Sequence, residues 1–132
     1  MTSERYFGTD GIRDRANSGL LSPESVLAIS RSLARELQAG AGSRPPRVLL
    51  GRDPRRSSPL IASQIAAGLL GGGVDVVDVG VLPTPAVALL TRREGFDAGV
   101  VVSASHNPAA DNGIKVFGSS GEKLPEPVED RI

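Results

Sequence analysis

Apolar residues recur at helical spacing in two stretches of the chain, and a serine followed by a proline opens each stretch. Serine is a favoured helix N-cap and proline a favoured first helical residue, so helices are predicted to begin after Ser22 and after Ser58. The apolar positions predicted to face a core are Val26, Ile29, Leu33, Leu37, Ile61, Ile65 and Leu69. The glycine run at residues 71–73 is expected to end the second helix.

Short runs rich in β-branched residues lie between the helical stretches and predict strands. They cover residues 47–51, 74–80 and 97–103, and a further short helix is expected over residues 84–93. The first segment, residues 5–19, mixes apolar and turn residues and is typical of a short strand or an extended arm. This alternation predicts an α/β domain of three layers (α/β/α), in which helices cover both faces of a mixed, mostly parallel sheet.

The last residues, EPVEDRI at 126–132, show the spacing of a new helix, with Val128 and Ile132 one turn apart. A domain seldom ends one turn into a helix. We therefore expect residues 1–132 to form one domain at the N-terminal end of a longer protein.

Composition narrows the functional class. Of the 132 residues 39% are hydrophobic, which is enough for an ordered domain with one core. The 15 basic and 15 acidic residues balance, so no net charge favours nucleic acid or a membrane surface as a partner. The absence of cysteine excludes disulfides, thiolate metal sites and cysteine nucleophiles. No apolar run has the length of a membrane span, and the first residues lack the apolar core of a signal peptide, so a cytoplasmic protein is expected.

Three polar loops follow predicted strands, at residues 51–57, 82–85 and 103–112. Ligands of open α/β sheets bind beyond the carboxyl ends of the strands, so these loops are the expected site. Ser105 in the third loop is the candidate nucleophile. A serine hydrolase is disfavoured because His106, the only histidine, directly follows Ser105 and would point away from it in an extended segment. A Gly-x-Ser-x-Gly elbow is also absent.

Phosphoryl transfer accounts better for the third loop, with the oxygen of Ser105 accepting or carrying the phosphoryl group. Cations are then needed, and a turn predicted at Asn112-Gly113 would bring Lys115 back toward Ser105. Pro108 holds the preceding residue extended and stiffens the loop. The glycine motifs of nucleotide-binding proteins are absent, so the phosphoryl donor is not expected to be a nucleotide bound by this domain.

Three motifs lie in and around these loops: RYFGTDGIR at residues 5–13, GRDPR at 51–55 and SASHNPAADNGIK at 103–115. With them the chain resembles the α-D-phosphohexomutase family. FGSSGEKL at residues 117–124 is similar to the hairpin that follows in that family, and the Gly-Thr-Asp-Gly-Ile-Arg opening is similar to its phosphoglucosamine branch. The resemblance covers most of the chain and implies the first domain of a four-domain phosphohexomutase.

The resemblance implies a phosphoserine enzyme, an isomerase that interconverts glucosamine 6-phosphate and glucosamine 1-phosphate for UDP-N-acetylglucosamine and cell-wall synthesis. Ser105 would carry the phosphoryl group, with a hexosamine 1,6-bisphosphate as the intermediate, and a phosphoryl oxygen on Ser105 would be a ligand of Mg2+. By the same resemblance Arg13 and Lys115 would contact the reacting groups, and His106 and Asn107 would line the phosphoserine loop.

In that family the other Mg2+ ligands and the loops that grip the sugar and its phosphate belong to later domains. This domain is therefore expected to be inactive alone and to act on a phosphosugar together with those domains. A homodimer of the full-length protein is one option for its assembly.

Some residues near the motifs allow a second interpretation. Asp14 stands where the family usually has glycine, and either Asp14 or Asp10 could pair with Arg13 in place of a functional contact. Pro54 removes a backbone donor from a loop in which the family more often has threonine.

The charged residues Arg52, Asp53 and Arg55 of the same loop are expected to form a structural ion-pair network beneath the site.

Two other functions stay open. A phosphoglucomutase or phosphomannomutase of the same family is one of them, since the loop that selects the sugar is not in this chain. A non-catalytic phosphosugar-binding module is the other, and the short length of the chain motivates it.

Overall fold

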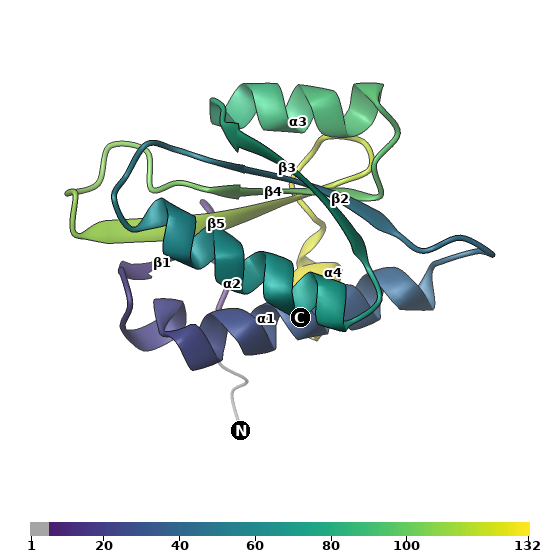
Figure 1. Ribbon diagram of the computed structural model, residues 1–132, viewed down its shortest axis with the longest axis horizontal. Helices are drawn as coiled ribbons and strands as arrows, with labels where there is room; N and C mark the ends of the chain where they lie inside the picture. Colours follow the sequence, from purple (N-terminus) through teal and green to yellow (C-terminus); the bar gives the residue numbers. More distant parts are fainter. Residues whose placement is uncertain (1–5) are drawn as a thin grey trace.

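The computed structural model describes residues 6–132 and has one five-stranded sheet with helices on both faces (Figure 1). Its elements are β1 (Ile12–Arg15), a 3-10 turn (Gly19–Leu21), α1 (Pro23–Ala39), β2 (Arg47–Arg52), α2 (Ser58–Gly71), β3 (Asp75–Val81), α3 (Thr84–Arg93), β4 (Ala98–Val102), β5 (Asp111–Gly118) and α4 (Glu126–Arg131). Arg5, which opens the first motif, lies outside the described residues. Within residues 6–132 no helix combines the length and the apolar character that crossing a membrane requires.

The sheet has the strand order β1-β5-β4-β2-β3. Strand β2 lies parallel to both β3 and β4, whereas β5 runs antiparallel to its neighbours β4 and β1. Of the strands in this sheet, β5 alone therefore opposes the common direction. This confirms the predicted mixed, mostly parallel sheet, and it places the carboxyl ends of β2, β3 and β4 at one edge.

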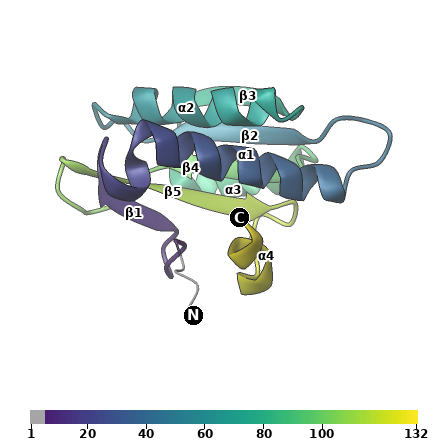
Figure 2. The same ribbon diagram turned by 90° about the horizontal axis from the view of Figure 1, so that it is seen from below.

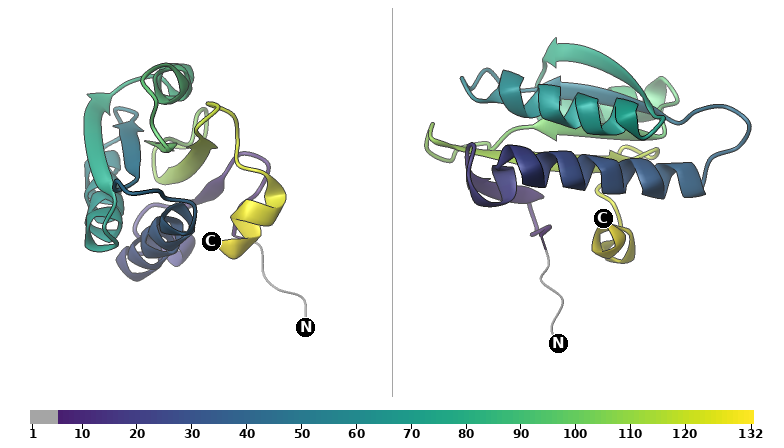
Figure 3. Two further views of the ribbon diagram at one scale, coloured as in Figure 1. Left: turned by 90° about the vertical axis from the view of Figure 1, so that its right-hand side faces the viewer. Right: turned by 60° about the horizontal axis from the view of Figure 1, so that its bottom comes forward.

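Helices α1 and α2 pack together on one face of the sheet, and α3 covers the other face (Figures 2 and 3). The central strands are thus buried on both faces, which explains their unbroken apolar runs. In β2, Val48 and Leu50 enter the larger core under α1 and α2, while Leu49 enters the smaller core under α3. The apolar stripes predicted for the two long helices are confirmed, since all their residues lie in or against the larger core.

The start of α1 matches the predicted cap, but the start of α2 does not. Ser22 Oγ accepts a hydrogen bond from Ser25 N at 3.2 Å, as expected of an N-cap. Helix α2 begins at Ser58, one residue earlier than predicted, with Ser57 as its N-cap. The reason is that Ser58 is buried and its hydroxyl donates to Asp53 Oδ1 at 2.6 Å, so this hydroxyl serves the loop before the helix.

The turn predicted at Asn112-Gly113 is wrong, because both residues lie inside β5 and the chain reverses over residues 103–110. Asn112 is fully buried, and its Nδ2 donates at 2.9 and 3.0 Å to two serine hydroxyls at the start of α2. A Cβ at Gly113 would lie 2.7 and 2.8 Å from backbone oxygens of the two flanking chain segments. Asn112 is therefore needed for its buried side-chain hydrogen bonds, and Gly113 because the neighbouring backbone leaves no room for a Cβ.

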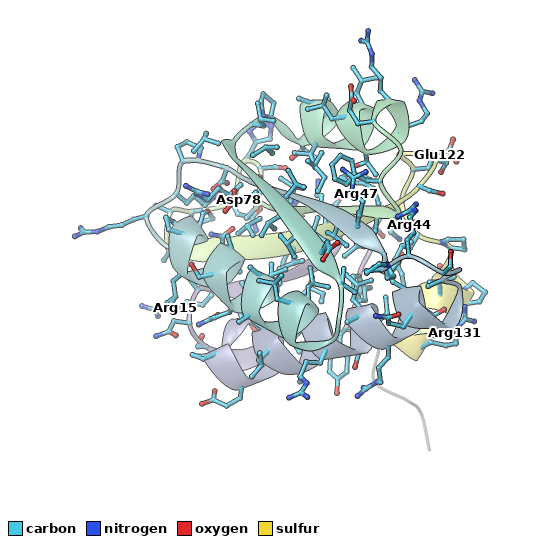
Figure 4. All side chains as sticks on the ribbon, turned by 45° about the vertical axis from the view of Figure 1, so that its right-hand side comes forward. Arg15, Arg44, Arg47, Asp78, Glu122 and Arg131 are labelled. Carbon is cyan, nitrogen blue, oxygen red and sulfur yellow. The ribbon has the colours of Figure 1, made fainter. Side chains whose placement is uncertain are left out.

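The predicted C-terminal helix forms as α4 and contacts α1. Arg131, labelled in Figure 4, donates to Glu36 Oε1 on α1 from Nε at 2.9 Å and from Nη2 at 2.6 Å. The hydrogen bond from Arg131 lowers the pKa of Glu36 below its ordinary value. Because Arg131 is exposed, this ion pair orients α4 and contributes little to stability.

Gly68 lies at a close contact between α1 and α2. A Cβ at this position would lie 2.5 Å from the Cβ of Ser30 and 3.1 Å from the backbone oxygen of Leu27, both on α1. Ser30 is buried, and its hydroxyl donates to Val26 O at 2.7 Å, so it cannot move aside freely. The spacing of the two helices thus depends on a residue without a side chain.

The substitution Gly68→Ala tests this contact. Alanine favours a helix over glycine by about 1 kcal/mol, but overpacking against Ser30 is expected to dominate and to lower the free energy of unfolding by about 1–3 kcal/mol. Gly71→Ala is the matched control, since a Cβ there would have nothing within 4 Å, and it is expected to maintain or raise stability. Urea unfolding measures both variants, and equal stabilities would contradict the prediction.

Candidate functional site

The loops that follow β2 and β4 meet at one edge of the sheet because these strands are parallel neighbours. Asp53 N, just after β2, donates to Val102 O at the end of β4 at 2.9 Å. Residues 53–57 therefore lie against residues 103–110, where a ligand of an open α/β sheet is expected. The third predicted loop, residues 82–85, follows β3 and leads directly into α3.

Ser105 is exposed and has a φ of +52°, in the left-handed region. A residue with a side chain costs on the order of 1 kcal/mol or more there, and it persists where surrounding contacts hold it. Its N–H donates to Ser103 Oγ at 3.2 Å, and its carbonyl accepts from Arg55 Nη2 at 3.0 Å. Among residues 6–132 no hydrogen bond engages the Ser105 hydroxyl, which is therefore available to a ligand.

Arg13 reaches the same loop from β1. Its Nη1 donates to Asn107 Oδ1 at 2.9 Å and to Ala104 O at 3.2 Å. The side chain is therefore fixed through one terminal nitrogen. The donors on Nε and Nη2 have no hydrogen-bond partner among the described residues, and Nε is buried. Arg13 thus brings a cation with uncommitted donors to the edge where Ser105 lies.

Asp14 does not pair with Arg13, contrary to one of the interpretations above. Its carboxylate accepts from Leu20 N at 2.9 Å and from Arg15 N at 2.7 Å. These backbone hydrogen bonds, that from Leu20 first, lower the pKa of Asp14 below its ordinary value of 3.8. The departure from the family pattern at residue 14 therefore closes the turn after β1 and leaves the Arg13 side chain in place.

Arg55 fills the space behind the Ser105 loop, and only 12% of its side chain is exposed. Its two terminal nitrogens donate at 2.8 to 3.2 Å to four backbone carbonyls, those of Ser105, Asn107 and Pro108 in that loop and that of Asp111 at the start of β5. Its Nε donates to Asp53 Oδ2 at 3.0 Å. Every N–H donor of the guanidinium is therefore committed within the domain.

Asp53 anchors Arg55 and also the start of α2. Its Oδ1 accepts from Arg55 N at 3.0 Å and from the Ser58 hydroxyl at 2.6 Å. Burial by itself raises the pKa of Asp53, but hydrogen bonds from Ser58, Arg55 and Ser103 outweigh burial and bring the pKa below its ordinary value of 3.8. Ser103 Oγ also accepts a hydrogen bond from Ser105 N at 3.2 Å.

The predicted ion-pair network is thus present for Asp53 and Arg55, but Arg52 lies outside it. Arg52 pairs with Asp78 on β3 at 3.4 Å. Two further arginines, Arg44 and Arg47, lie together at the end of the molecule away from Arg15 (Figure 4). Arg44 forms an ion pair with Asp97 at 3.2 Å, and the Arg47 guanidinium lies 4.6 Å from the centre of the Phe96 ring.

The other residues expected in the phosphoserine loop have different surroundings. Asn107 is half-buried, its side chain accepts from Arg13, and its N–H donates to Ala104 O at 3.0 Å, so it supports the loop from within. His106 is exposed and makes no hydrogen bond among the described residues. Their contact with a substrate stays a prediction.

No hydrogen bond joins Lys115 to Ser105 among the described residues. Lys115 lies on β5 opposite Val101, two residues before the loop that carries Ser105. Its side chain lines a pocket together with Asp10 and Thr84, among other residues. The function expected of Lys115 beside the phosphoserine therefore stays a prediction.

Sequence reasoning missed the buried polar residues behind the loop, Ser58, Ser103 and Asn112. Asn112 was visible as a polar residue beside apolar ones, but the Asn-Gly pair favoured a turn. One feature of the sequence could have indicated them. Asp53 and Ser58 follow one strand and Ser103 follows another, and parallel pairing of these strands places the segments side by side.

Residues 6–132 do not form a complete magnesium site. Within residues 6–132 no three acidic, histidine or cysteine side chains are grouped so that they could hold a metal ion. Mg2+ prefers carboxylates in near-octahedral geometry, and Ser105 would contribute one phosphoryl oxygen. The described side chains therefore do not hold Mg2+ by themselves.

Comparison with known proteins shows to which family the chain is related. The chain matches the family model described as phosphoglucomutase/phosphomannomutase, alpha/beta/alpha domain I, over residues 4–132. It is 51% identical over 128 residues to a phosphoglucosamine mutase of Salinispora tropica and 54% identical over 128 residues to one of Moorella thermoacetica. Each alignment covers 97% of this chain and 28% of the relative, so the chain spans less than a third of their length. A solved phosphoglucomutase/phosphomannomutase family protein from Burkholderia thailandensis matches with a TM-score of 0.80 at 30% identity, over 99% of this chain and 30% of that one.

Acid should remove the contribution of Asp53 to stability. Because the folded pKa lies below the unfolded one, the Asp53 carboxylate stabilises the fold fully above about pH 4, and this contribution is lost as the pH falls through the folded pKa. Asp53→Asn is therefore expected to lower the free energy of unfolding at neutral pH, and by progressively less as the pH falls below about 4. The exposed Asp75→Asn variant controls for the loss of a charge. Urea unfolding across this pH range measures the difference, and a difference independent of pH would contradict the assignment.

Proposed function

This chain belongs to the phosphoglucomutase/phosphomannomutase family, as its α/β/α domain I, and from this premise we propose that Ser105 carries the phosphoryl group of a phosphoglucosamine mutase. The observation that carries the proposal is the uncommitted hydroxyl of Ser105, held on a left-handed residue at the carboxyl edge of the sheet beside Arg13. The names of relatives at 51 and 54% identity support glucosamine phosphate as the sugar.

In the proposed reaction the phosphoryl group on Ser105 moves to the O1 hydroxyl of glucosamine 6-phosphate. The bond from phosphorus to Ser105 Oγ breaks, a bond from phosphorus to the sugar oxygen forms, and the hydroxyl proton passes from that oxygen to Ser105 Oγ. In the second transfer the bond from phosphorus to O6 of glucosamine 1,6-bisphosphate breaks, a bond from phosphorus to Ser105 Oγ forms, and the Oγ proton passes to O6. Glucosamine 1-phosphate leaves, and the net change is an isomerisation.

Positioning and neutralisation of charge supply most of the catalysis in such transfers. The N–H groups of Arg13 Nη2, which have no partner among the described residues, suit the phosphoryl oxygens, and Asn107 would keep Arg13 aimed at them. Lys115 and His106 are proposed to meet the sugar phosphate from the neighbouring strand and from the loop. Mg2+, when bound to a phosphoryl oxygen on Ser105, would add positive charge at the reacting group, with its other ligands outside this domain.

The whole reaction is proposed for the longer protein. The substrate would lie between this domain and further domains, and the isolated domain would be inactive. The product would feed UDP-N-acetylglucosamine synthesis in the cytoplasm. The full-length protein could act as a monomer or a homodimer.

Removal of the phosphoryl acceptor tests the proposal. In the full-length gene product, Ser105→Ala is expected to abolish mutase turnover while thermal unfolding stays unchanged, because the hydroxyl makes no hydrogen bond among the described residues. Ser119→Ala on the exposed hairpin after β5 is the matched control and should keep full activity. Phosphosite mapping by mass spectrometry, before and after incubation with glucosamine 1,6-bisphosphate, should locate phosphate on Ser105 of the unaltered protein. An unmodified Ser105 in an active enzyme would refute the proposal.

The sugar is tested separately. Glucosamine 6-phosphate is expected to give a higher kcat/KM than glucose 6-phosphate or mannose 6-phosphate in a coupled assay. A preference for glucose 6-phosphate or mannose 6-phosphate would refute the proposed sugar, while the proposed phosphoserine chemistry would stand.

A further inference from the structure

The backbone of Ser105 is tied at both of its ends. Its N–H is held by Ser103 Oγ at 3.2 Å and its carbonyl by Arg55 Nη2 at 3.0 Å. The tether through Arg55 leads on to Asp53, whose Oδ2 accepts from Arg55 Nε at 3.0 Å. A left-handed residue with a side chain needs this kind of restraint, since it would otherwise relax to a more favourable conformation.

Arg55 is suited to this restraint by its shape. Its planar fork donates to three carbonyls of the loop, to one at the start of β5 and to one carboxylate at the same time. Lysine has the same charge but donates from a single nitrogen, so it could reach only part of this set. The function of Arg55 therefore depends on its geometry more than on its charge.

Arg55 is not suited to bind the phosphoryl group directly. Its charge is matched by Asp53 at 3.0 Å, and the two side chains are only 12% and 18% exposed. All its donors are committed to the protein, in contrast to those of Arg13. An effect of Arg55 on phosphoryl transfer would thus act through the loop that carries Ser105.

We propose that Arg55 is a positioning residue for phosphoryl transfer: with Asp53 it fixes the loop so that Ser105 presents its oxygen in one orientation. The proposal rests on the phosphoserine function proposed for Ser105. Misplacement of a reacting atom by about 1 Å can slow a reaction on the order of 10²-fold, so a loosened loop should be visible in kcat.

The test compares Arg55→Lys with Arg56→Lys in the full-length gene product. Both substitutions conserve the charge, and Arg56 is the next residue and exposed. The two variants therefore differ in that only Arg55→Lys removes the guanidinium that donates to the loop. Arg55→Lys is expected to lower kcat on the order of 10²-fold while KM changes by less than about threefold, and to slow Ser105 phosphorylation by glucosamine 1,6-bisphosphate in a single turnover to the same extent. Arg56→Lys should match the unaltered protein in each measurement.

Hydrogen exchange separates positioning from a general effect on folding. Positioning predicts that Arg55→Lys loses protection within residues 105–111 and keeps it in α1, α2 and the central strands. Loss of protection throughout the domain, or loss of cooperative unfolding, would assign Arg55 to the fold as a whole and would overturn the proposal. A kcat equal to that of Arg56→Lys would overturn it as well.

The two proposals fail in different ways. If the unaltered protein has no phosphate on Ser105 and no mutase activity, the phosphoserine function itself is refuted. If the unaltered protein is phosphorylated and active while both lysine variants behave alike, the phosphoserine function stands and only the positioning by Arg55 is refuted.

Discussion

The hydrogen bonds from Arg55 to the carbonyl groups of the Ser105 loop are the interaction on which the rest of the site depends. A tight reversal between two strands leaves several carbonyls without a partner in the sheet, and backbone carbonyls of folded proteins are usually paired. The guanidinium donates to three carbonyls of the loop and to that of Asp111 at the start of β5. With these carbonyls satisfied from behind, Ser105 can keep a left-handed conformation on an exposed loop.

The mixed sheet is what brings the parts of the site together. The parallel pairing of β2 with β4 sets the Arg55 loop beside the Ser105 loop. The antiparallel return of β5 next to β4 then allows β1 to pair with β5, and this pairing brings Arg13 to the same edge. In a purely parallel sheet a crossover connection would replace the short reversal that carries Ser105. The single opposed strand of this sheet is therefore a requirement of the site.

Local patterns predicted the helices and strands well, because the spacing of apolar residues within each element reflects which of its faces is buried. The stripes of α1 and α2 and the unbroken apolar strands are examples. The failures occur where a residue serves a distant partner. The local sequence of Asn112 is typical of a turn, but its side chain donates to serine hydroxyls at the start of α2. The local sequence of Ser58 is typical of an N-cap, but its hydroxyl donates to Asp53. Such contacts depend on strand order and register, which cannot be deduced from a short stretch of sequence.

The candidate site shows the same division. The motifs singled out Ser105, Arg13 and Arg55, but only the structure distinguishes the two arginines. Both have the same charge and lie near the same loop, yet Arg55 has a carboxylate partner and no uncommitted donor, whereas Arg13 has uncommitted donors. A phosphoserine carries nearly two negative charges at neutral pH, and one arginine cannot neutralise them. If Ser105 carries a phosphoryl group, as proposed, the described contacts of this loop would balance only part of its charge. The remaining positive charge would then come from outside these contacts, from Lys115 on the neighbouring strand, from a metal ion or from another domain, and the exposed position of Ser105 leaves room for each of them.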